Sequence, residues 1–188
     1  MMLSAIPFVP FVHHNYTGYV RFCTSAERPG WCDRVLPSIY NHVQDTYWNV
    51  GFLRYWTVSN IPNFVLALPM LLNVYAFSAF YLARLPRMYP GLFVSRPTKA
   101  KRTRDMESLF LVPELLPHVL HALALTLLLT FNAHVQIVLR VLPSVPVVYW
   151  AAARLVIERP GWGRAWVAWS IVWGAVSCVL WAVFLPPA

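Results

Sequence analysis

The chain has 188 residues, of which 59% are hydrophobic and only 12% are charged, and its formal net charge is +8. Ordinary soluble domains carry about a quarter of their residues as charged side chains. The low charge content and the long apolar blocks exclude a typical soluble domain. They predict an all-α membrane protein, because a helix satisfies its own backbone hydrogen bonds inside a bilayer.

The N-terminal residues 1–14 begin with the apolar run MMLSAIPFVPFV. This run is too short to cross the hydrocarbon core of a membrane. It also lacks the basic segment that opens a signal peptide. We therefore expect residues 1–14 to be the end of a truncated transmembrane helix.

Residues 15–60 are predicted to form a loop on the non-cytosolic side of the membrane. The loop is rich in aromatic residues: Trp31, Tyr40, Tyr47, Trp48, Phe52, Tyr55 and Trp56. Disordered segments are poor in such residues, so we expect short amphipathic helices that lie on the membrane surface. A simple aromatic belt at the interface is the alternative interpretation.

Two features of this loop are typical of an oxidising compartment. Cys23 and Cys32 are disulfide candidates there, and two free thiols are the alternative. Asn15 begins the sequon Asn15-Tyr16-Thr17 and is a glycosylation candidate.

Four apolar segments are long enough, or nearly so, to cross a membrane, and they are residues 61–83, 113–131, 141–157 and 165–185. The third is interrupted by Pro143 and Pro146, which remove backbone donors from a helix. We expect it to be a span that is short or broken at its start, with a re-entrant segment as the alternative.

The distribution of basic residues predicts the orientation. The loop 84–112 carries seven of them, and Arg154, Arg159 and Arg164 bring that side to ten of the chain's fifteen. The side richer in Lys and Arg faces the cytosol. Attraction to anionic membrane lipids accounts for this charge, so no nucleic-acid partner is predicted.

Polar side chains set among aromatic rings predict a site for a phosphorylated or glycosylated lipid on the lumenal side. Rings stack on sugars, amides bond sugar hydroxyls, and arginine pairs with phosphate. The first loop contributes the candidates Gln44, Tyr47, Trp48, Asn49 and Arg54. The second lumenal connection, NAHVQIVLR, contributes His134, Gln136 and Arg140.

Glu114, His118 and His121 share one helix face at a spacing that would suit a metal. Pro117 lies among them, and no lumenal residue completes a ligand set. Interhelical hydrogen bonding is the better interpretation, and no metal is predicted.

Several motifs together resemble one family. They are YWNVGFLRYW (47–56), IPNF (61–64), HVQ (134–136) with an arginine four residues later, YW (149–150) and FLP (184–186). They resemble the GPI mannosyltransferase 2 family (PIG-V), of which the chain covers only the C-terminal half. The resemblance implies a multi-pass enzyme of the endoplasmic reticulum membrane with part of a GT-C fold.

The implied reaction adds the second mannose, in α-1,6 linkage, to a GPI precursor glycolipid. The donor would be dolichyl phosphate mannose, with no other cofactor, and a small membrane partner subunit is possible. In GT-C enzymes the acidic residue treated as the general base lies in a first lumenal loop that this chain lacks. Asp45 is the only candidate substitute. We therefore expect a fragment without the catalytic acid, or alternatively a non-catalytic scaffold or assembly subunit.

Overall fold

The computed structural model describes residues 6–25, 27–88 and 109–183, except for the side chain of Arg87. The regular elements of these residues are all helices, as predicted. Three of them are long and apolar enough to cross a membrane, and a bent pair would make a fourth span. Contacts divide the chain into two compact units, Met1–Arg54 and Tyr55–Ala188. This division is not visible in the composition, and each unit is described by itself.

The first unit consists of α1 (Val9–Cys23), the short helix η2 (Gly30–Asp33) and α2 (Ile39–Trp48). α1 and α2 meet at Gly18, where a Cβ atom would lie only 2.7 Å from Cγ2 of Ile39. The hydroxyl of Ser38 caps α2 by accepting from the backbone N–H of Asn41, at 3.2 Å. The apolar N-terminal helix was predicted to end at residue 14, which is wrong. It continues to Cys23 because its second half packs on α2 and is tied to η2.

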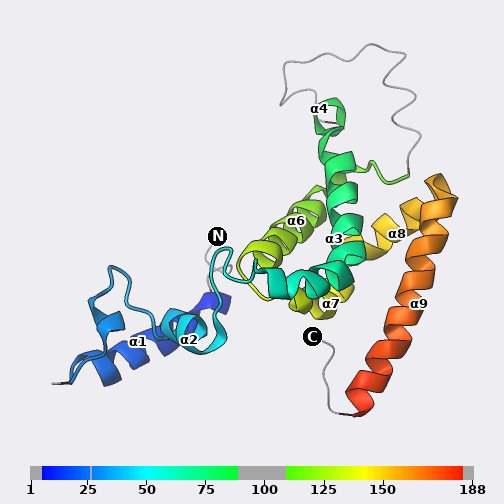
Figure 1. Ribbon diagram of the computed structural model, residues 1–188. Helices are drawn as coiled ribbons and strands as arrows, with labels where there is room; N and C mark the ends of the chain where they lie inside the picture. Colours follow the sequence, from blue (N-terminus) through cyan, green and yellow to red (C-terminus); the bar gives the residue numbers. More distant parts are fainter. Residues whose placement is uncertain (1–5, 26, 89–108, 184–188) are drawn as a thin grey trace. The chain divides into compact units, whose positions relative to one another are not determined.

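The second unit is built around α3 (Ile61–Leu82), which contacts both α6 (Leu116–Phe131) and α8 (Pro146–Glu158). One face of α3 supplies much of the buried core: Ala67, Met70, Leu71, Val74, Phe77 and Tyr81. Figure 1 shows α9 (Pro160–Ala182) as a long helix that follows α8 after a tight turn. The short elements α4 (Leu85–Met88) and η4 (Pro113–Leu115) complete the ends of α3 and α6.

The third predicted span, residues 141–157, has the predicted break but starts earlier in the chain. Val135–Ser144, which contains η5 (Val135–Ile137), α7 (Val138–Val141) and η6 (Leu142–Ser144), meets Pro146–Glu158 at 85°. Its apolar side chains face the core at helical spacing: Val135, Val138, Leu139 and Leu142. Residues 135–140 are therefore helical turns and not the simple connection that the sequence predicted. The bend is compatible with a broken span and with a re-entrant segment alike.

The other predicted boundaries agree within a few residues, except at α9. This helix begins at Pro160 and not at residue 165, because proline favours the first turn of a helix. Of the predicted basic loop, Arg96, Lys99, Lys101, Arg102 and Arg104 lie outside the described residues, as does the FLP motif.

Candidate functional site

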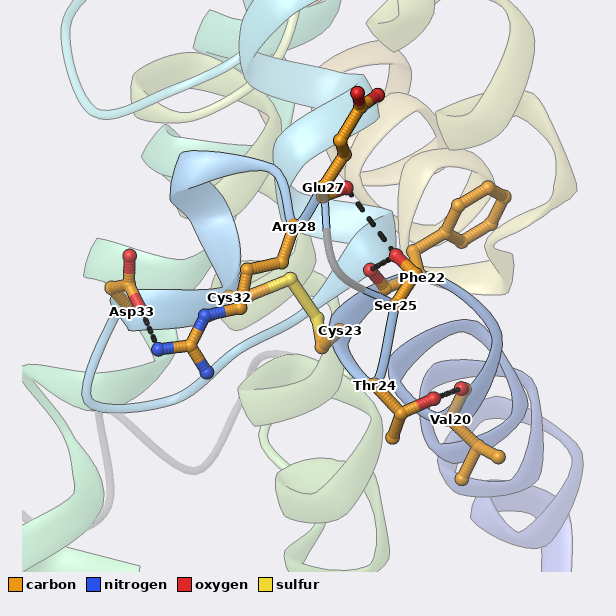
Figure 2. Close-up of a disulfide and its surroundings, with 9 residues drawn as sticks. All are labelled: Val20, Phe22, Cys23, Thr24, Ser25, Glu27, Arg28, Cys32 and Asp33. Carbon is orange, nitrogen blue, oxygen red and sulfur yellow. Dashed lines mark hydrogen bonds and ion pairs between the residues drawn. A yellow bond between two sulfur atoms is a disulfide. The ribbon is translucent and has the colours of Figure 1, made fainter.

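A disulfide joins the end of α1 to η2, which confirms the predicted pairing of Cys23 with Cys32. Figure 2 shows the bond beside an ion pair between Arg28 and Asp33, whose charged atoms lie 3.4 Å apart. Next to Cys32, the buried ring of Trp31 stacks on His42 of α2, with centroids 6.0 Å apart. The bond and this stack together fasten η2 between the two helices of the unit.

Asn15, the glycosylation candidate, lies within α1 with its side chain engaged. Its Nδ2 atom donates to the carbonyl of Phe11 at 2.9 Å, and its Oδ1 atom accepts from the hydroxyl of Ser38 at 2.6 Å. The nitrogen that would carry a glycan is therefore already used within the fold. Glycosylation stays a prediction, and the structure gives Asn15 a role in joining α1 to α2.

Asp45 lies on α2 between two arginines. Its carboxylate accepts a hydrogen bond from Arg54 and lies 3.4 Å from Arg34. A general base must present a free carboxylate oxygen to the hydroxyl that it deprotonates. The arrangement therefore favours Asp45 as an anchor for the two arginines over Asp45 as the base. The guanidinium of Arg54, predicted to meet a phosphate, already has this acidic partner.

The turn after α2 has an irregular backbone. Asn49 ends the helix in the left-handed region, with φ 49°, and Leu53 repeats that conformation at φ 59°. The backbone N–H of Val50 donates to the carbonyl of Gln44 at 2.9 Å. At Gly51, a Cβ atom would lie 2.9 Å from the side chain of Arg54, which folds back toward Asp45. The left-handed turns thus bring Arg54 to its partner.

Asn49 was predicted to bond a sugar hydroxyl, and its backbone conformation offers a second reason for its presence. Asparagine tolerates the left-handed region far better than β-branched residues do. We expect Asn49→Gly to retain the stability of the protein, and Asn49→Val to cost about 1–3 kcal/mol of stability. Thermal unfolding of the two variants tests the conformational role. An equal loss of stability in both variants would contradict this conformational role.

The second unit contains a cluster of aromatic and amide side chains that we call the YW cluster: Tyr55, Trp56, Asn60, Asn63, Phe64, Thr130, Phe131 and His134. The ring of Tyr55 stacks on His134, with centroids 4.6 Å apart and planes at 24°. The Tyr55 hydroxyl accepts from Nδ2 of Asn63 at 2.7 Å, and its carbonyl accepts from Asn60 at 2.9 Å. Three of the motifs behind the family resemblance therefore meet in one place.

Trp56 secures the YW cluster to the end of α6. Its indole N–H donates to the carbonyl of Thr130 at 2.9 Å. Its ring lies parallel to Phe131 at 5.7 Å, and Phe64 covers it at 4.9 Å. From the sequence, Tyr55 and Trp56 were predicted only as loop aromatics, and Asn63 and Phe64 were not predicted as site residues. The IPNF motif, a few residues after YW, was the available signal.

The remaining predicted site residues fall on both units. In the first, Gln44, Tyr47 and Trp48 lie on α2, and the side chains of Tyr47 and Trp48 are 75% and 61% exposed. In the second, Gln136 is half-buried in η5 and Arg140 is exposed in α7, two and six residues after His134. Aromatic rings, amides and arginines therefore occur together in each unit, as a sugar-phosphate site requires.

The three residues considered as metal ligands contact an aromatic ring or are exposed. The ring of His118 contacts Trp150 of α8 edge to face, at 5.6 Å, which is an interhelical contact through rings. Glu114 and His121 are exposed. Within the described part of the chain, no group of three or more His, Cys, Asp or Glu residues is close enough to hold a metal ion.

Helices that are long and apolar enough to cross a membrane define the class of this chain as a helical membrane protein. The family model described as mannosyltransferase (PIG-V) matches residues 1–188. The chain belongs to this family, which confirms the resemblance seen in its motifs.

Three curated relatives illustrate the similarity. GPI mannosyltransferase 2 of Cryptococcus neoformans var. neoformans serotype D is 38% identical over 100% of this chain and 45% of the relative. The protein of the same name from Candida albicans is 34% identical over 100% of this chain and 40% of the relative. GPI alpha-1,6-mannosyltransferase 2 of Cricetulus griseus is 33% identical over 78% of this chain and 35% of the relative. The chain thus spans less than half the length of these relatives, and no solved structure matches it.

Proposed function

We propose that this chain forms the C-terminal part of a GPI α-1,6-mannosyltransferase of the endoplasmic reticulum membrane. The observation that carries the proposal is the family match over residues 1–188, together with relatives that are named for this activity. The enzyme would have a GT-C fold and would use dolichyl phosphate mannose to add the second mannose to a GPI precursor. A small membrane partner subunit belongs to the same proposal.

In the proposed reaction, a hydroxyl oxygen of the GPI precursor attacks C1 of the donor mannose. The bond from C1 to the phosphate oxygen breaks, dolichyl phosphate leaves, and the hydroxyl proton passes to a carboxylate. Asp45 is already paired with Arg34 and Arg54, so we assign this carboxylate to a part of the enzyme outside the chain.

The arginines of the first unit are suited to the phosphate that leaves. Arg34 and Arg54 share one carboxylate, and about half of each side chain is exposed. A phosphate approaching Arg54 would gain charge-assisted hydrogen bonds, while Asp45 keeps the guanidinium in place. In the YW cluster, Asn63 bonds the Tyr55 hydroxyl and the Tyr55 ring stacks on His134, so the imidazole is positioned to bond a sugar hydroxyl, as are Gln136 and Arg140.

The ion pairs of Asp45 also support the alternative, a non-catalytic scaffold or assembly subunit, for this chain taken alone. Complementation distinguishes the two functions. The chain is expressed in cells that lack the second GPI mannosyltransferase, alone and joined to the N-terminal part of the Cryptococcus relative. Rescue of surface GPI-anchored proteins by the joined form alone supports the proposal. Failure of a well-expressed joined form contradicts it, and rescue by the chain alone would return Asp45 to the role of base.

The same assay tests the role of Arg54. We expect Arg54→Ala in the joined form to lower mannosylation by about 10²-fold or more, because it removes a charged donor from the leaving phosphate. Asp45→Asn keeps the shape of the side chain and should cost less. Arg28→Ala is the matched control, since Arg28 pairs with Asp33 in the same unit. Normal transfer by a well-expressed Arg54→Ala protein would rule out the phosphate contact.

A further inference from the structure

A groove of about 730 Å³ lies between α3, α8 and α9 in the second unit. Its walls are almost wholly apolar and include Leu72 and Ala76 of α3, Leu155 of α8, and Trp162 and Trp166 of α9. The volume is within the range of protein sites that bury most of a small ligand. A groove of this kind on membrane-spanning helices is suited to an acyl chain.

The groove lies toward the end of α3 and the beginning of α9. Along α3 it extends from Phe77 to Leu68, which is 14 residues, or about 21 Å at the rise of an α-helix, before the end of the helix. Along α9 it lies within the first ten residues, from Trp162 to Trp169. Its mouth is at the last turn of α8 and the first turns of α9. The groove therefore opens toward the side of the chain that is rich in basic residues, which is predicted to face the cytosol.

The opening of the groove is positively charged. Arg154 lines it, donates to Glu158 at 2.7 Å, and places its guanidinium 3.3 Å from the ring centroid of Phe80. Arg84 lies over the same ring at 4.1 Å. Arg159 and Arg164 follow at the turn from α8 to α9, so four arginines accompany a single glutamate among the described residues here.

A buried polar atom on the groove wall lacks a partner. Nε1 of Trp166 has no hydrogen-bond acceptor among the described residues. An indole N–H can only donate, so it needs an oxygen or a similar acceptor. This atom is not accessible from the groove in the structure, so an ester oxygen of a glycerophospholipid would accept from it only after the Trp166 side chain rotates. Oδ1 of Asn73, on the α3 wall of the groove, also lacks a partner among the described residues, and an acyl chain does not account for it.

We propose that this groove binds an anionic glycerophospholipid, with one acyl chain between α3 and α9 and its phosphate near Arg84 and Arg154. Anionic lipids are abundant in cytosolic leaflets, and basic pockets between membrane helices bind their headgroups. The groove is separate from the YW cluster, whose residues Asn63 and Phe64 lie at the other end of α3. Lipid binding there does not depend on the activity of the protein.

The purified full chain is reconstituted in phosphatidylcholine nanodiscs that contain a minor fraction of phosphatidylserine, and retained lipids are counted by native mass spectrometry. We expect phosphatidylserine to be enriched among them. Arg154→Gln should lower the enrichment about fivefold, the factor that corresponds to about 1 kcal/mol for one arginine near the surface. Ala76→Phe should abolish retention, because the new ring fills the groove.

Ala79→Phe is the matched control, since Ala79 is exposed on the same helix outside the groove. If Ala76→Phe impairs folding, Ala165→Phe fills the groove from the opposite wall. Equal retention of both phospholipids, or a similar effect of Ala76→Phe and Ala79→Phe, would overturn the proposal. Displacement of phosphatidylserine by an equal amount of dolichyl phosphate would also overturn it, in favour of a polyprenyl phosphate.

Discussion

Gly163→Ala is expected to lower the free energy of unfolding of this protein by about 1–3 kcal/mol, as overpacking of a close contact does. Gly163 is buried where α9 crosses α8, and a Cβ atom there would lie 2.6 Å from Cα and 2.8 Å from N of Val156. These are backbone atoms of α8 and cannot rotate away as a flexible side chain could. The gain in helix propensity from glycine to alanine, at most about 1 kcal/mol, is too small to offset the clash.

Two glycines of the same helix provide matched controls. At Gly161 and Gly174, no heavy atom of the described residues outside α9 would lie within 4 Å of an added Cβ atom. Gly161→Ala and Gly174→Ala should therefore leave the stability unchanged or raise it by up to about 1 kcal/mol. Thermal unfolding of the three variants in detergent measures the difference. Equal midpoints for Gly163→Ala and Gly174→Ala would show that α8 and α9 do not approach as closely as described.

Loss of the disulfide should destabilise the first unit by about 2–5 kcal/mol, the usual cost of removing a native bond from a small domain. The unit ends at Arg54, and a domain of that size buries a small share of its surface and is only marginally stable, so a covalent constraint has a large relative effect. The bond also holds Trp31, which is only 5% exposed, against α2. Cys23→Ser combined with Cys32→Ser should therefore expose the ring and loosen η2.

Limited trypsin digestion measures this effect at the bond after Arg34, which directly follows the short helix, since the bond after Arg28 precedes Pro29 and resists trypsin. We expect the double variant to be cleaved there much faster than the unmodified protein, and a reducing agent to have the same effect. Cys178→Ser is the control, since this exposed free cysteine lies on α9. Unchanged cleavage in the double variant would mean that the helix contacts alone stabilise the unit.

Features that depend on neighbours in the sequence were predicted well. The apolar blocks at residues 61–83 and 113–131 correspond to helices, because a span of that length has no other way to satisfy its backbone in lipid. Pro143 and Pro146 predicted a break, which the structure has. The family motifs predicted the family, and the cysteine spacing predicted a bond that the structure contains.

Contacts between residues that are far apart along the chain could not be predicted from the sequence. Arg54 and Asp45 were assigned separate roles, and the left-handed turn at Asn49 that brings Arg54 back was not foreseen. The stacking of Tyr55 on His134 joins positions almost eighty residues apart. No local pattern records such a pairing, because it arises only when α3 and the turns before α7 pack together.

By itself, the sequence determined that this protein is helical, that its apolar segments suit a membrane, and that it belongs to the PIG-V mannosyltransferases. These properties follow from composition, local periodicity and short motifs, each of which is complete within a few residues. Only the tertiary structure decided which side chains are partners and where an apolar groove opens beside a cluster of arginines. Those outcomes depend on the packing of whole helices, and the side chains at a helix contact come from segments that are remote along the chain.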